Sequence, residues 1–490
     1  MAGTEAGVSE NPVRERIRCG LCVIGAGSGG LSVAAAAAQM GVKTVLIERG
    51  AMGGDCLNTG CVPSKSLLAA AKAAQAVRTA SRFGVAFPNG GANGGYEPAI
   101  DFAAVHAHVR NTIAAIAPHD SQERFEGLGV RVIRASARFT GPRTVVAGGV
   151  EVRARRFVLA TGSRAAVPPI PGLDGVPYLT NETIFERTAA PEHLIVLGGG
   201  PIGVEMAQAH RRLGARVTVV EKQVLLPRDD PEMVEVVRRR LTAEGVTLIE
   251  GAGAAAVERA GDGVAVVLDN GRRIEGSDLL VAAGRRPNVE DLDLDAAGIE
   301  AHRGGVATDR RLRTTNRRVY AVGDVTGGPA FTHVAGHHAG LVVRNALFRL
   351  PARENYAALP WVTYTDPELA QVGPTEAEAR TAYGVVEVLR QPFAGNDRAR
   401  AEGDAEGLVK VLAHRGRVIG ASIAGPHAGE QIALWCLAVA QRAKVSTLAG
   451  LMLPYPTLSE AGKRAAGSLF TPTLFGAKTR ALVRVLGWFG

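Results

Sequence analysis

Residues 22–50 read "CVIGAGSGGLSVAAAAAQMGVKTVLIERG", and this stretch predicts the fold of the first part of the chain. A short apolar strand leads into Gly25-x-Gly27-x-x-Gly30, a helix of small residues follows, and a second apolar strand ends at Glu48. Such glycines allow a tight turn in which a pyrophosphate meets free N–H groups at a helix N-terminus, and an acid after the second strand accepts hydrogen bonds from a ribose diol. The stretch therefore indicates a dinucleotide site.

A second stretch repeats this plan. Residues 194–222, "LIVLGGGPIGVEMAQAHRRLGARVTVVEK", contain Gly198-x-Gly200-x-x-Gly203 and Glu221. In both copies the acid lies 23 residues after the first glycine. One such glycine pattern is weak evidence because glycine-rich turns are common, but two copies in the same strand–turn–helix–strand frame are strong evidence. The sequence predicts two dinucleotide-binding units.

A further echo supports a duplication. Two buried-type strands, in "RRFVLATGSR" and "SDLLVAAGRR", both end in A-x-G-x-R, with Gly162 and Gly284 as their glycines. The first unit carries an insertion between its fingerprint and this echo. A later strand, in "VYAVGDVTGG", ends at Gly323 and Asp324, and after about Tyr356 the chain becomes β-rich with an apolar helix around residues 431–440. We expect a third domain there.

Composition limits the class of protein. The chain has 490 residues, of which 46% are hydrophobic and 21% charged, as in ordinary globular proteins of about three domains. The N-terminal residues carry acids and no apolar core, which argues against a secretory signal, and no run approaches the roughly 20 apolar residues of a membrane span. We expect a cytoplasmic protein. The net charge of +9 comes from scattered arginines without a basic block, so no nucleic-acid partner is expected.

Two of the five cysteines lie close together in residues 53–65, "GGDCLNTGCVPSK". Positions i and i+5 of a regular helix are about 140° apart, so Cys56 and Cys61 can be bridged only across a distorted turn, which Gly60 permits. Pro63 suits the first turn of a following helix, which places Cys61 at a helix N-terminus, where the dipole favours a thiolate. In a reducing compartment such a pair tends to be redox-active or metal-bound.

A zinc site is the alternative for these thiols. Cys19 and Cys22 form a C-x-x-C that could join Cys56 and Cys61 in a four-thiolate site. Cys22, however, lies within the first predicted strand, where both faces should be packed. We therefore predict no metal site, and expect Cys19, Cys22 and Cys436 to be small apolar residues. His337 and His338 are expected to be helix residues rather than ligands.

The chain as a whole resembles the FAD-dependent pyridine nucleotide–disulfide oxidoreductases, the family of dihydrolipoamide dehydrogenase, glutathione reductase and mercuric reductase. The resemblance extends from Leu21 to Phe475 and rests on "GAGSGG", "GGDCLNTGCVPSK", "ATG", "GGGPIGVE", "AAGRRPN", "VGDVTGG", "TDPELAQVG" and "YPTLSE". It implies an α/β fold with two Rossmann-like dinucleotide-binding domains and a C-terminal α+β dimerisation domain. It also implies a homodimer that binds FAD and NAD(P).

The resemblance assigns roles to individual residues. It implies that Cys61 is the charge-transfer thiol against the flavin, that Cys56 is the interchange thiol facing the acceptor, and that Lys65 pairs with Glu205 near the flavin's reactive nitrogen. The implied FAD contacts are Gly25, Gly27, Gly30, Glu48, Lys65, Thr161, Gly162 and Asp324, and the implied pyridine-nucleotide contacts are Gly198, Gly200, Gly203, Glu221 and Gly284. Because a carboxylate repels a 2′-phosphate, Glu221 predicts NADH rather than NADPH.

Domain boundaries follow from the motifs. We expect a disordered extension over residues 1–18, an FAD-binding domain over 19–165 and 290–355, an NAD-binding domain over 166–289, a dimerisation domain over 356–475 and an amphipathic tail over 476–490. The tail, with "KTRALVRVLGWFG", mixes three cations with apolar residues and could lie on a membrane surface. Packing on its own dimer is the alternative.

The sequence departs from the family pattern at one position. Where disulfide reductases of this family carry a His-Pro with a glutamate five residues after the histidine, supplied by the partner subunit, this chain has Tyr455, Pro456 and Glu460. A tyrosine titrates near 10 and a histidine near 6.5, so Tyr455 is a poor acid/base group at neutral pH. Tyr455 could also simply pack at the dimer interface.

The predicted activity is that of an FAD-dependent oxidoreductase that passes electrons from NAD(P)H through the Cys56–Cys61 disulfide to a disulfide-type acceptor. A mercuric reductase-like reaction with a metal ion and a quinone reductase are the alternatives, since a tyrosine at this point resembles mercuric reductase, although no cysteine follows Cys436. A non-catalytic FAD-binding scaffold is the alternative of another class. The intact cysteine pair, Lys65 and both fingerprints argue against it.

Overall fold

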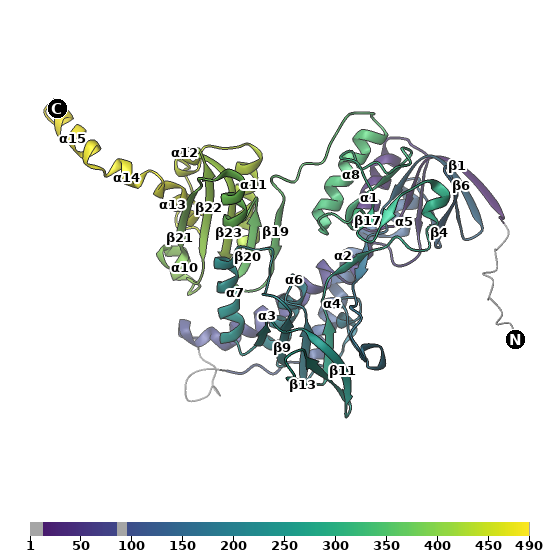
Figure 1. The fold of residues 1–490 in the computed structure, drawn as a ribbon, viewed down its shortest axis with the longest axis horizontal. Helices are drawn as coiled ribbons and strands as arrows, with labels where there is room; N and C mark the ends of the chain where they lie inside the picture. The colour runs from purple at the N-terminus through teal and green to yellow at the C-terminus, as the bar shows by residue number, and fades with distance from the viewer. Residues whose placement is uncertain (1–12, 86–95, 490) are drawn as a thin grey trace.

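The computed structural model describes residues 13–85 and 96–489, which form three regions (Figure 1). The first lies at the right of Figure 1. It contains the N-terminal strands β1 (Glu15–Ile24) and β2 (Thr44–Glu48) and the later segment around α8 (Thr332–Ala346). The second lies below it, and the third, at the left, is formed by the chain beyond residue 356. This arrangement confirms the predicted α/β architecture with two nucleotide-binding units and a C-terminal α+β unit.

A seven-stranded sheet forms the first region. Its order is β3-β2-β1-β6-β5-β4, with β18 also paired to β6. The parallel part consists of β3 (Arg131–Arg134), β2 (Thr44–Glu48), β1 (Glu15–Ile24), β6 (Val150–Leu159) and β18 (Val319–Ala321). The antiparallel edge is β5 (Thr144–Ala147) and β4 (Ala137–Gly141). Helices α1 (Ser28–Gln39) and α8 lie side by side (Figure 1).

The first strand starts earlier than expected. Residues 15–18, which the sequence analysis placed in a disordered extension, belong to β1 and pair in parallel with residues 150–153 of β6. Ile17 and Cys19 are buried while Arg16 and Arg18 are exposed, so the segment alternates as a half-buried strand does. Four of the five residues in "RERIR" are charged, so the sequence does not look like a strand there. Residues 1–12 of the expected extension lie outside the described residues.

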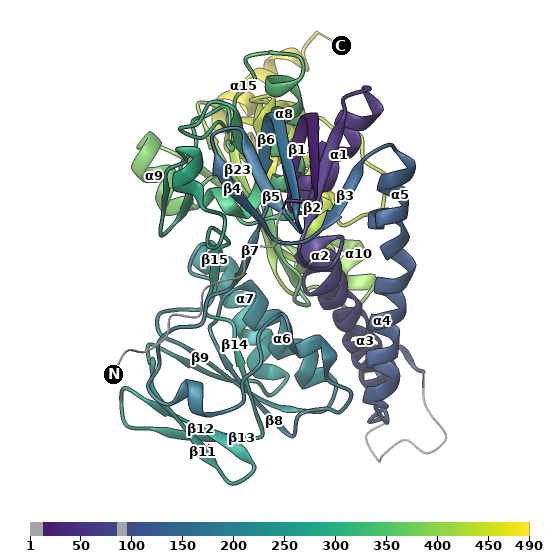
Figure 2. The same ribbon diagram turned by 90° about the vertical axis from the view of Figure 1, so that its right-hand side faces the viewer.

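Helices fill the insertion between β2 and β3. They are α2 (Gly54–Asn58), α3 (Cys61–Thr79), α4 (Phe102–Ile116) and α5 (Gln122–Gly127), with the short 3₁₀ segment η2 (Ala117–Asp120) before α5. Figure 2 shows α3 and α4 as a long pair that runs from the first sheet down beside the second region. Helix α3 packs against α6 (Pro201–Arg212) of that region. The cysteine segment therefore lies at the junction of two regions.

The second region repeats the fingerprint unit in a smaller sheet. Its parallel order is β10-β9-β8-β14, formed by β10 (Thr247–Glu250), β9 (Arg216–Glu221), β8 (His193–Leu197) and β14 (Asp278–Val281). Helix α7 (Pro231–Ala243) follows β9, and β11 (Ala254–Ala260), β12 (Gly263–Leu268) and β13 (Arg273–Gly276) form an antiparallel sheet. The two sequence echoes meet at its junction with the first region, where β7 (Ser163–Ala165) pairs with β15 (Arg285–Pro287).

The third region is a five-stranded antiparallel sheet with helices. Its order is β19-β20-β23-β22-β21, formed by β19 (Pro360–Thr363), β20 (Glu368–Val372), β23 (Arg417–Gly425), β22 (Leu408–His414) and β21 (Glu387–Pro392). The expected apolar helix is α11 (Ala428–Ala440), which packs on β20 and β23. Helices α12 (Val445–Ala449) and α13 (Glu460–Ser468) follow it, and then α14 (Thr471–Leu474) and α15 (Ala477–Leu486) extend away from the body of the molecule (Figure 1).

Residues considered as metal ligands take structural places. Cys19 and Cys22 are buried in β1, and His338 is fully buried in α8, the helix that also contains His337. No group of three metal-ligating side chains occurs among the described residues. Over the same residues, no helix combines the length and apolar character needed to cross a bilayer.

Candidate active site

The first fingerprint forms a tight turn over the end of the sheet. Gly25 has φ +105°, and a Cβ on it would lie 2.2 Å from the carbonyl oxygen of Ala160. A Cβ on Gly30 would lie 1.9 Å from the oxygen of Gly25, so both positions exclude any other residue. Gly27 caps α1 without a side-chain hydrogen bond, which leaves the N–H groups of the first turn free for an anion. These features fit the pyrophosphate of a dinucleotide.

Glu48 lies where a ribose would be bound. At the end of β2, its carboxylate accepts hydrogen bonds from the backbone N–H of Ala26 and of Gly50, both at 2.6 Å. The carboxylate therefore spans the glycine turn and is held at its edge, in the position that a diol contact requires.

The second fingerprint has the same geometry. Gly198 has φ +113°, and its Cβ would lie 2.4 Å from the oxygen of Ala282; a Cβ on Gly203 would lie 1.9 Å from the oxygen of Gly198. Gly200 caps α6 without a side-chain bond. The carboxylate of Glu221 accepts from the N–H of Gly199 at 2.7 Å and of Gln223 at 2.8 Å. The two turns are structural copies.

The cysteine segment packs directly on the first turn. Gly53 caps α2 in the left-handed region, at φ +87°, and Gly54 has φ +62°. A Cβ on Gly54 would lie 2.7 Å from the Cα of Gly27, and Gly53 and Gly27 form a parallel bridge. The glycine pair in "GGDC" thus allows the backbone around Cys56 to lie against the fingerprint turn.

Cys56 lies on α2 and Cys61 on the following α3, and each thiol shifts the pKa of the other. Both are free thiols here. Gly60 caps α3, so Cys61 is the first residue of that helix, as predicted. The hydrogen bond from Cys56 is the main factor that lowers the pKa of Cys61 to about 6; contact with Thr332, whose hydroxyl oxygen lies 3.3 Å from its sulfur, and the charge of Lys65 add to it. The same hydrogen bond and burial raise the pKa of Cys56. Cys61 is thus the thiolate of the pair at neutral pH.

Lys65 and Glu205 are brought together from two regions. The Nζ of Lys65 on α3 lies 2.9 Å from the Oε2 of Glu205 on α6, whose side chain is 6% exposed. The backbone N–H of Tyr364 donates to the other oxygen of Glu205 at 2.9 Å, and the Lys65 ammonium lies 4.3 Å from the centre of the Tyr364 ring. All three regions therefore meet at Glu205.

Thr161, Gly162 and Asp324 lie together at the end of the first sheet. Asn288 binds the backbone of both Thr161 and Gly162. Ser163 donates to the Oδ2 of Asp324 at 2.5 Å.

Sequence reasoning missed Arg285 as part of this cluster. Its Nε donates to Ser163 at 2.7 Å, and its guanidinium lies 3.2 Å from a carboxylate oxygen of Asp55, next to Cys56. Arg285 follows Gly284, where the chain has φ +131°. The pairing of the two A-x-G-x-R echoes was the signal that could have indicated it, because Arg285 and Ser163 occupy equivalent positions in them.

A cavity of about 430 Å³ lies beside Cys56. It is lined by α1, by α2, by the start of α3, by the segment from the end of α4 to α5, and by Thr332. Cys56, Leu31, Ile116 and Phe125 are among its walls, and Asp120 and Arg124 are its charged residues. In the described part of the chain, neither Lys65 nor Glu205 lines it. The cavity therefore gives access to Cys56 from the side away from that ion pair.

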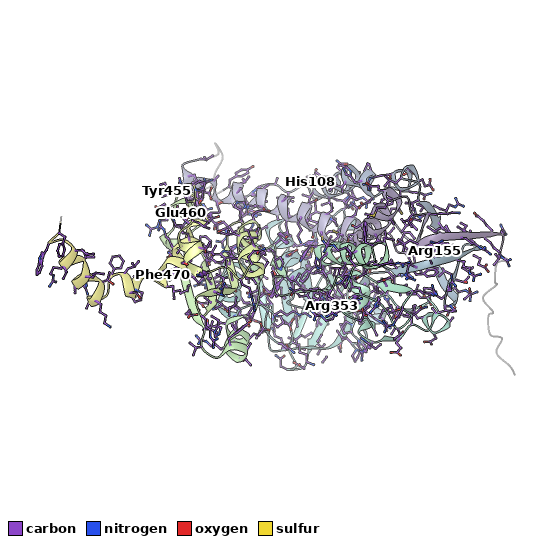
Figure 3. The ribbon with its side chains drawn as sticks, turned by 90° about the horizontal axis from the view of Figure 1, so that it is seen from above. His108, Arg155, Arg353, Tyr455, Glu460 and Phe470 are labelled. Atoms are coloured by element: carbon purple, nitrogen blue, oxygen red, sulfur yellow. The ribbon has the colours of Figure 1, made fainter. Side chains whose placement is uncertain are left out.

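Tyr455 and Glu460 lie on the third region (Figure 3), and neither lines the cavity. The Tyr455 side chain is exposed and its hydroxyl donates to Asp397 at 3.0 Å rather than to Glu460. This hydrogen bond raises the pKa of Tyr455 further above its usual value. One carboxylate oxygen of Glu460 is buried without a hydrogen-bond partner among the described residues.

Comparison with known proteins places these motifs in context. Residues 20–339 match the family profile described as "Pyridine nucleotide-disulphide oxidoreductase", and residues 359–466 match its dimerisation domain. The chain is 38% identical over 458 residues to a mercuric reductase from Streptomyces lividans, covering 91% of this chain and 95% of the relative. It is 36% identical to a dihydrolipoyl dehydrogenase from Thermus scotoductus, covering 92% and 97%.

Two solved structures also match this chain over most of its length. The Cu(II) complex of the HOCl-induced flavoprotein disulfide reductase RclA from Escherichia coli matches with a TM-score of 0.83 at 26% identity, covering 92% of this chain and 100% of that one. LpdA from Mycobacterium tuberculosis matches with a TM-score of 0.83 at 30% identity, covering 92% and 99%.

Proposed function

From the premise that this chain belongs to the pyridine nucleotide-disulphide oxidoreductase family, we propose that Cys56 and Cys61 form the redox centre through which it reduces its acceptor. The chain is an NAD(P)H-dependent flavoprotein disulfide oxidoreductase that binds FAD, and its dimerisation domain makes it a homodimer. The observation that supports the proposed redox centre best is the position of the two thiols. Cys61 is the first residue of α3, with the Thr332 hydroxyl oxygen 3.3 Å from its sulfur, and Cys56 on the preceding helix lines the cavity.

The residues present fit the two cofactors. We propose that the free N–H groups after Gly27, with Glu48 and Asp324, hold FAD, and that the turn at Gly198 to Gly203, with Glu221 and Gly284, holds the pyridine nucleotide. Bound FAD supplies the chemistry that links a two-electron hydride donor to a disulfide. Lys65, which contacts Glu205 and Tyr364, places a positive charge near the thiol of Cys61.

The chain's own part in the reaction is thiol exchange. Two electrons reduce the Cys56–Cys61 disulfide to a thiol and a thiolate. With a disulfide acceptor, the sulfur of Cys56 loses its proton and attacks, forming a mixed disulfide and releasing one thiolate, which takes up a proton. The Cys61 thiolate then attacks the Cys56 sulfur, closes the Cys56–Cys61 disulfide and releases the second thiolate.

Tyr455 is a poor proton acceptor at neutral pH, and this limits the class of acceptor. An exposed phenol with a raised pKa, bonded to Asp397, cannot take a proton from Cys56 at neutral pH. The proposed acceptors therefore need little proton transfer: a reactive disulfide, or a soft metal ion that takes two electrons directly from the thiolate pair. A quinone that accepts from the flavin side is the third candidate.

An anaerobic titration tests the proposed redox centre. The purified protein should be yellow and should need about two electron pairs from NADH per subunit for full reduction, one for the flavin and one for the disulfide. A non-catalytic FAD-binding scaffold, or a protein whose cysteines are structural, would need only one.

The nucleotide preference tests the second fingerprint. We expect a higher kcat/KM for NADH than for NADPH, because the Glu221 carboxylate is held at the edge of the turn and repels a 2′-phosphate. Glu221→Ala should reduce this preference by about tenfold, the effect of removing one close charge at the surface. Arg216→Gln is the matched control, because Arg216 on the same strand pairs with Glu192 instead. A wild-type preference for NADPH would contradict the assignment.

We also propose that the C-terminal tail binds an anionic membrane surface. After Glu460 the chain has five cations and no acid. No residue from Thr471 to Phe489 is buried, and Phe475, Trp488 and Phe489 are at least 70% exposed. On α15 Leu482 and Val485 share one side, while Arg480 and Arg484 lie one turn apart on the opposite side. A helix of this kind lies in the lipid interface with its cations toward anionic headgroups.

Vesicle sedimentation tests the tail. The full chain should bind vesicles that contain anionic phosphatidylglycerol at least about tenfold better than neutral phosphatidylcholine vesicles, and high salt should weaken the binding. A chain that ends at Gly476 should lose it, as should Leu482→Asp with Leu486→Asp, which removes the apolar side but keeps every cation. If truncation instead turns the dimer into a monomer, the tail belongs to the dimer interface and the membrane proposal is wrong.

A further inference from the structure

The cavity beside Cys56 contains an unpaired carboxylate. Asp120 ends η2 and contributes to the wall that also holds Cys56. Its side chain is half-buried, and it has no hydrogen bond and no ion pair within the described residues. A Cβ on Gly53 would lie 3.1 Å from the Oδ2 of Asp120, so the carboxylate lies against the backbone three residues before Cys56. A half-buried charge without a partner is costly unless a ligand supplies one.

The other charges around the cavity do not cancel this carboxylate. Arg124 also lines the wall, but it is exposed, donates to the carbonyl of His119 and lies over the Phe125 ring. Burial outweighs the attraction of Arg124 and His119 and raises the pKa of Asp120, as expected when neither side chain is in close contact with it. Next to the cavity, the Cys61 thiolate, bonded to the lining residue Thr332, adds a second negative charge. The remaining lining residues are uncharged.

We propose that Asp120 makes this cavity selective for acceptors that carry positive charge where they approach Cys56. This inference rests on the proposed function, because it assigns a substrate class to the same redox centre. Two kinds of acceptor share that chemistry: a disulfide with amine groups, and a metal cation. Asp120 is the specificity-determining residue, and an anionic disulfide is disfavoured by the same charge.

Charged thiol reagents test the selectivity without a natural acceptor. In the full-length FAD-bound Cys61→Ser protein, only Cys56 of the pair can react. Methanethiosulfonates that carry a trimethylammonium group, a sulfonate group or no charge each add their thioalkyl group to a thiolate and release methanesulfinate. Mass analysis of the peptide that contains Cys56 gives the three rates. A change in the thiolate fraction alters all three rates equally, so it cancels in their ratio.

The cation-to-anion rate ratio at Cys56, divided by the same ratio for free 2-mercaptoethanol, should be about tenfold or more. Asp120→Asn should bring it close to one, Asp120→Glu should keep it, and Glu123→Gln, an exposed carboxylate on neighbouring α5, should leave it unchanged. A wild-type ratio near one, or a ratio that Asp120→Asn does not change, would overturn the inference while leaving the redox centre intact. If Cys56 resists all three reagents, the cavity is not its access route and the inference fails too. The proposed function itself fails only in the NADH titration.

Turnover with chosen acceptors then distinguishes an amine-bearing disulfide from a metal cation as the positively charged acceptor. With NADH and the wild-type protein, cystamine, a cationic disulfide, and Cu²⁺, two of which take up the electron pair of one NADH, are compared with dithiodiglycolate, an anionic disulfide. Faster turnover of cystamine identifies an amine-bearing disulfide as the source, and faster turnover of Cu²⁺ identifies a metal ion; both support the inference. Dithiodiglycolate reduced faster than either cation would contradict it.

Discussion

Cys61→Ser should remove the long-wavelength absorbance band of the NADH-reduced protein and lower the reduction of any acceptor that needs the thiol pair by about 10³-fold or more. The band requires a thiolate beside the flavin, and Cys61 is the sulfur that the structure holds ionised. Its pKa of about 6 depends on the hydrogen bond from Cys56, the contact with Thr332 and the charge of Lys65. A serine hydroxyl in the same place stays protonated at neutral pH.

Cys56→Ser should give the opposite result. The band should be present without any reductant, because Cys61 can no longer form a disulfide. Its pH dependence gives a quantitative check. The thiolate persists above its pKa and is lost as the pH falls through it, near pH 6 in the reduced wild-type protein. In Cys56→Ala the midpoint should move upward, because alanine removes the hydrogen-bond donor that is the main stabiliser of the Cys61 thiolate, whereas the hydroxyl of Cys56→Ser can still donate.

Quinone reduction serves as the control for both cysteine variants. A quinone that takes electrons directly from the flavin side bypasses the thiols, so its rate should change little in either variant. If Cys61→Ser keeps the band, or if both variants reduce metal ions and disulfides at the wild-type rate, the assignment of Cys61 and Cys56 as the redox centre is wrong.

Lys410→Met should destabilise the protein by about 3–5 kcal/mol, the usual cost of removing one partner from a buried ionic cluster. The Lys410 side chain on β22 is 2% exposed. Its Nζ lies 2.8 Å from Asp230, 2.6 Å from Glu232 and 3.2 Å from Glu376. Asp230 caps α7, so the cluster connects the second region to the third. Methionine fills a similar volume but leaves Asp230 without a cation among the described residues, and leaves Glu232 and Glu376 with exposed arginines only.

Urea unfolding followed by the fluorescence of Trp361 measures this loss, because Trp361 donates to Asp229, next to Asp230. Arg390→Gln is the matched control: Arg390 bonds the same Glu232 and Glu376 but its side chain is 41% exposed, so its loss should cost no more than about 1 kcal/mol. If Lys410→Met costs as little as Arg390→Gln, water reaches the carboxylates and the cluster does not act as a buried connection.

The stability difference between Lys410→Met and wild type should depend on pH. Burial opposes ionisation of Glu232, yet hydrogen bonds from Lys410 and Arg390 lower its pKa below the ordinary value. A lowered carboxylate pKa contributes stability that is present at neutral pH and is lost as the pH falls through the folded-state value. The advantage of the wild-type protein should therefore shrink in acid, where a protonated Glu232 no longer needs a cation.

The sequence correctly predicted the features that depend only on residues close together in the chain. Both glycine turns, the acids at their edges and the start of a helix at Cys61 follow from residues close together in the chain, and the structure has the same local geometry at each. The Lys65–Glu205 pairing was available only through the family resemblance, because 140 residues separate the two.

The rest depends on contacts that no local pattern encodes. Lys410 stands in the apolar run "GLVKVLAH", which names no partner for its charge, and its burial depends on carboxylates from two distant helices. Asp120 is one acid among several in a helical stretch, and only the fold places it beside Cys56. The expected disorder at residues 15–18 was wrong because the partner strand that orders them lies more than a hundred residues later.

The meeting of three regions at Glu205 bears on how this chain can be recombined with its relatives. A chimera that exchanges only the nucleotide-binding segment brings in a new α6, and with it a new partner for Lys65 and for the backbone at Tyr364. Crossover points placed at the apparent domain borders therefore separate groups that contact one another in this chain. Nucleotide specificity should transfer cleanly between relatives only when α3, α6 and the segment before β20 are taken from one parent.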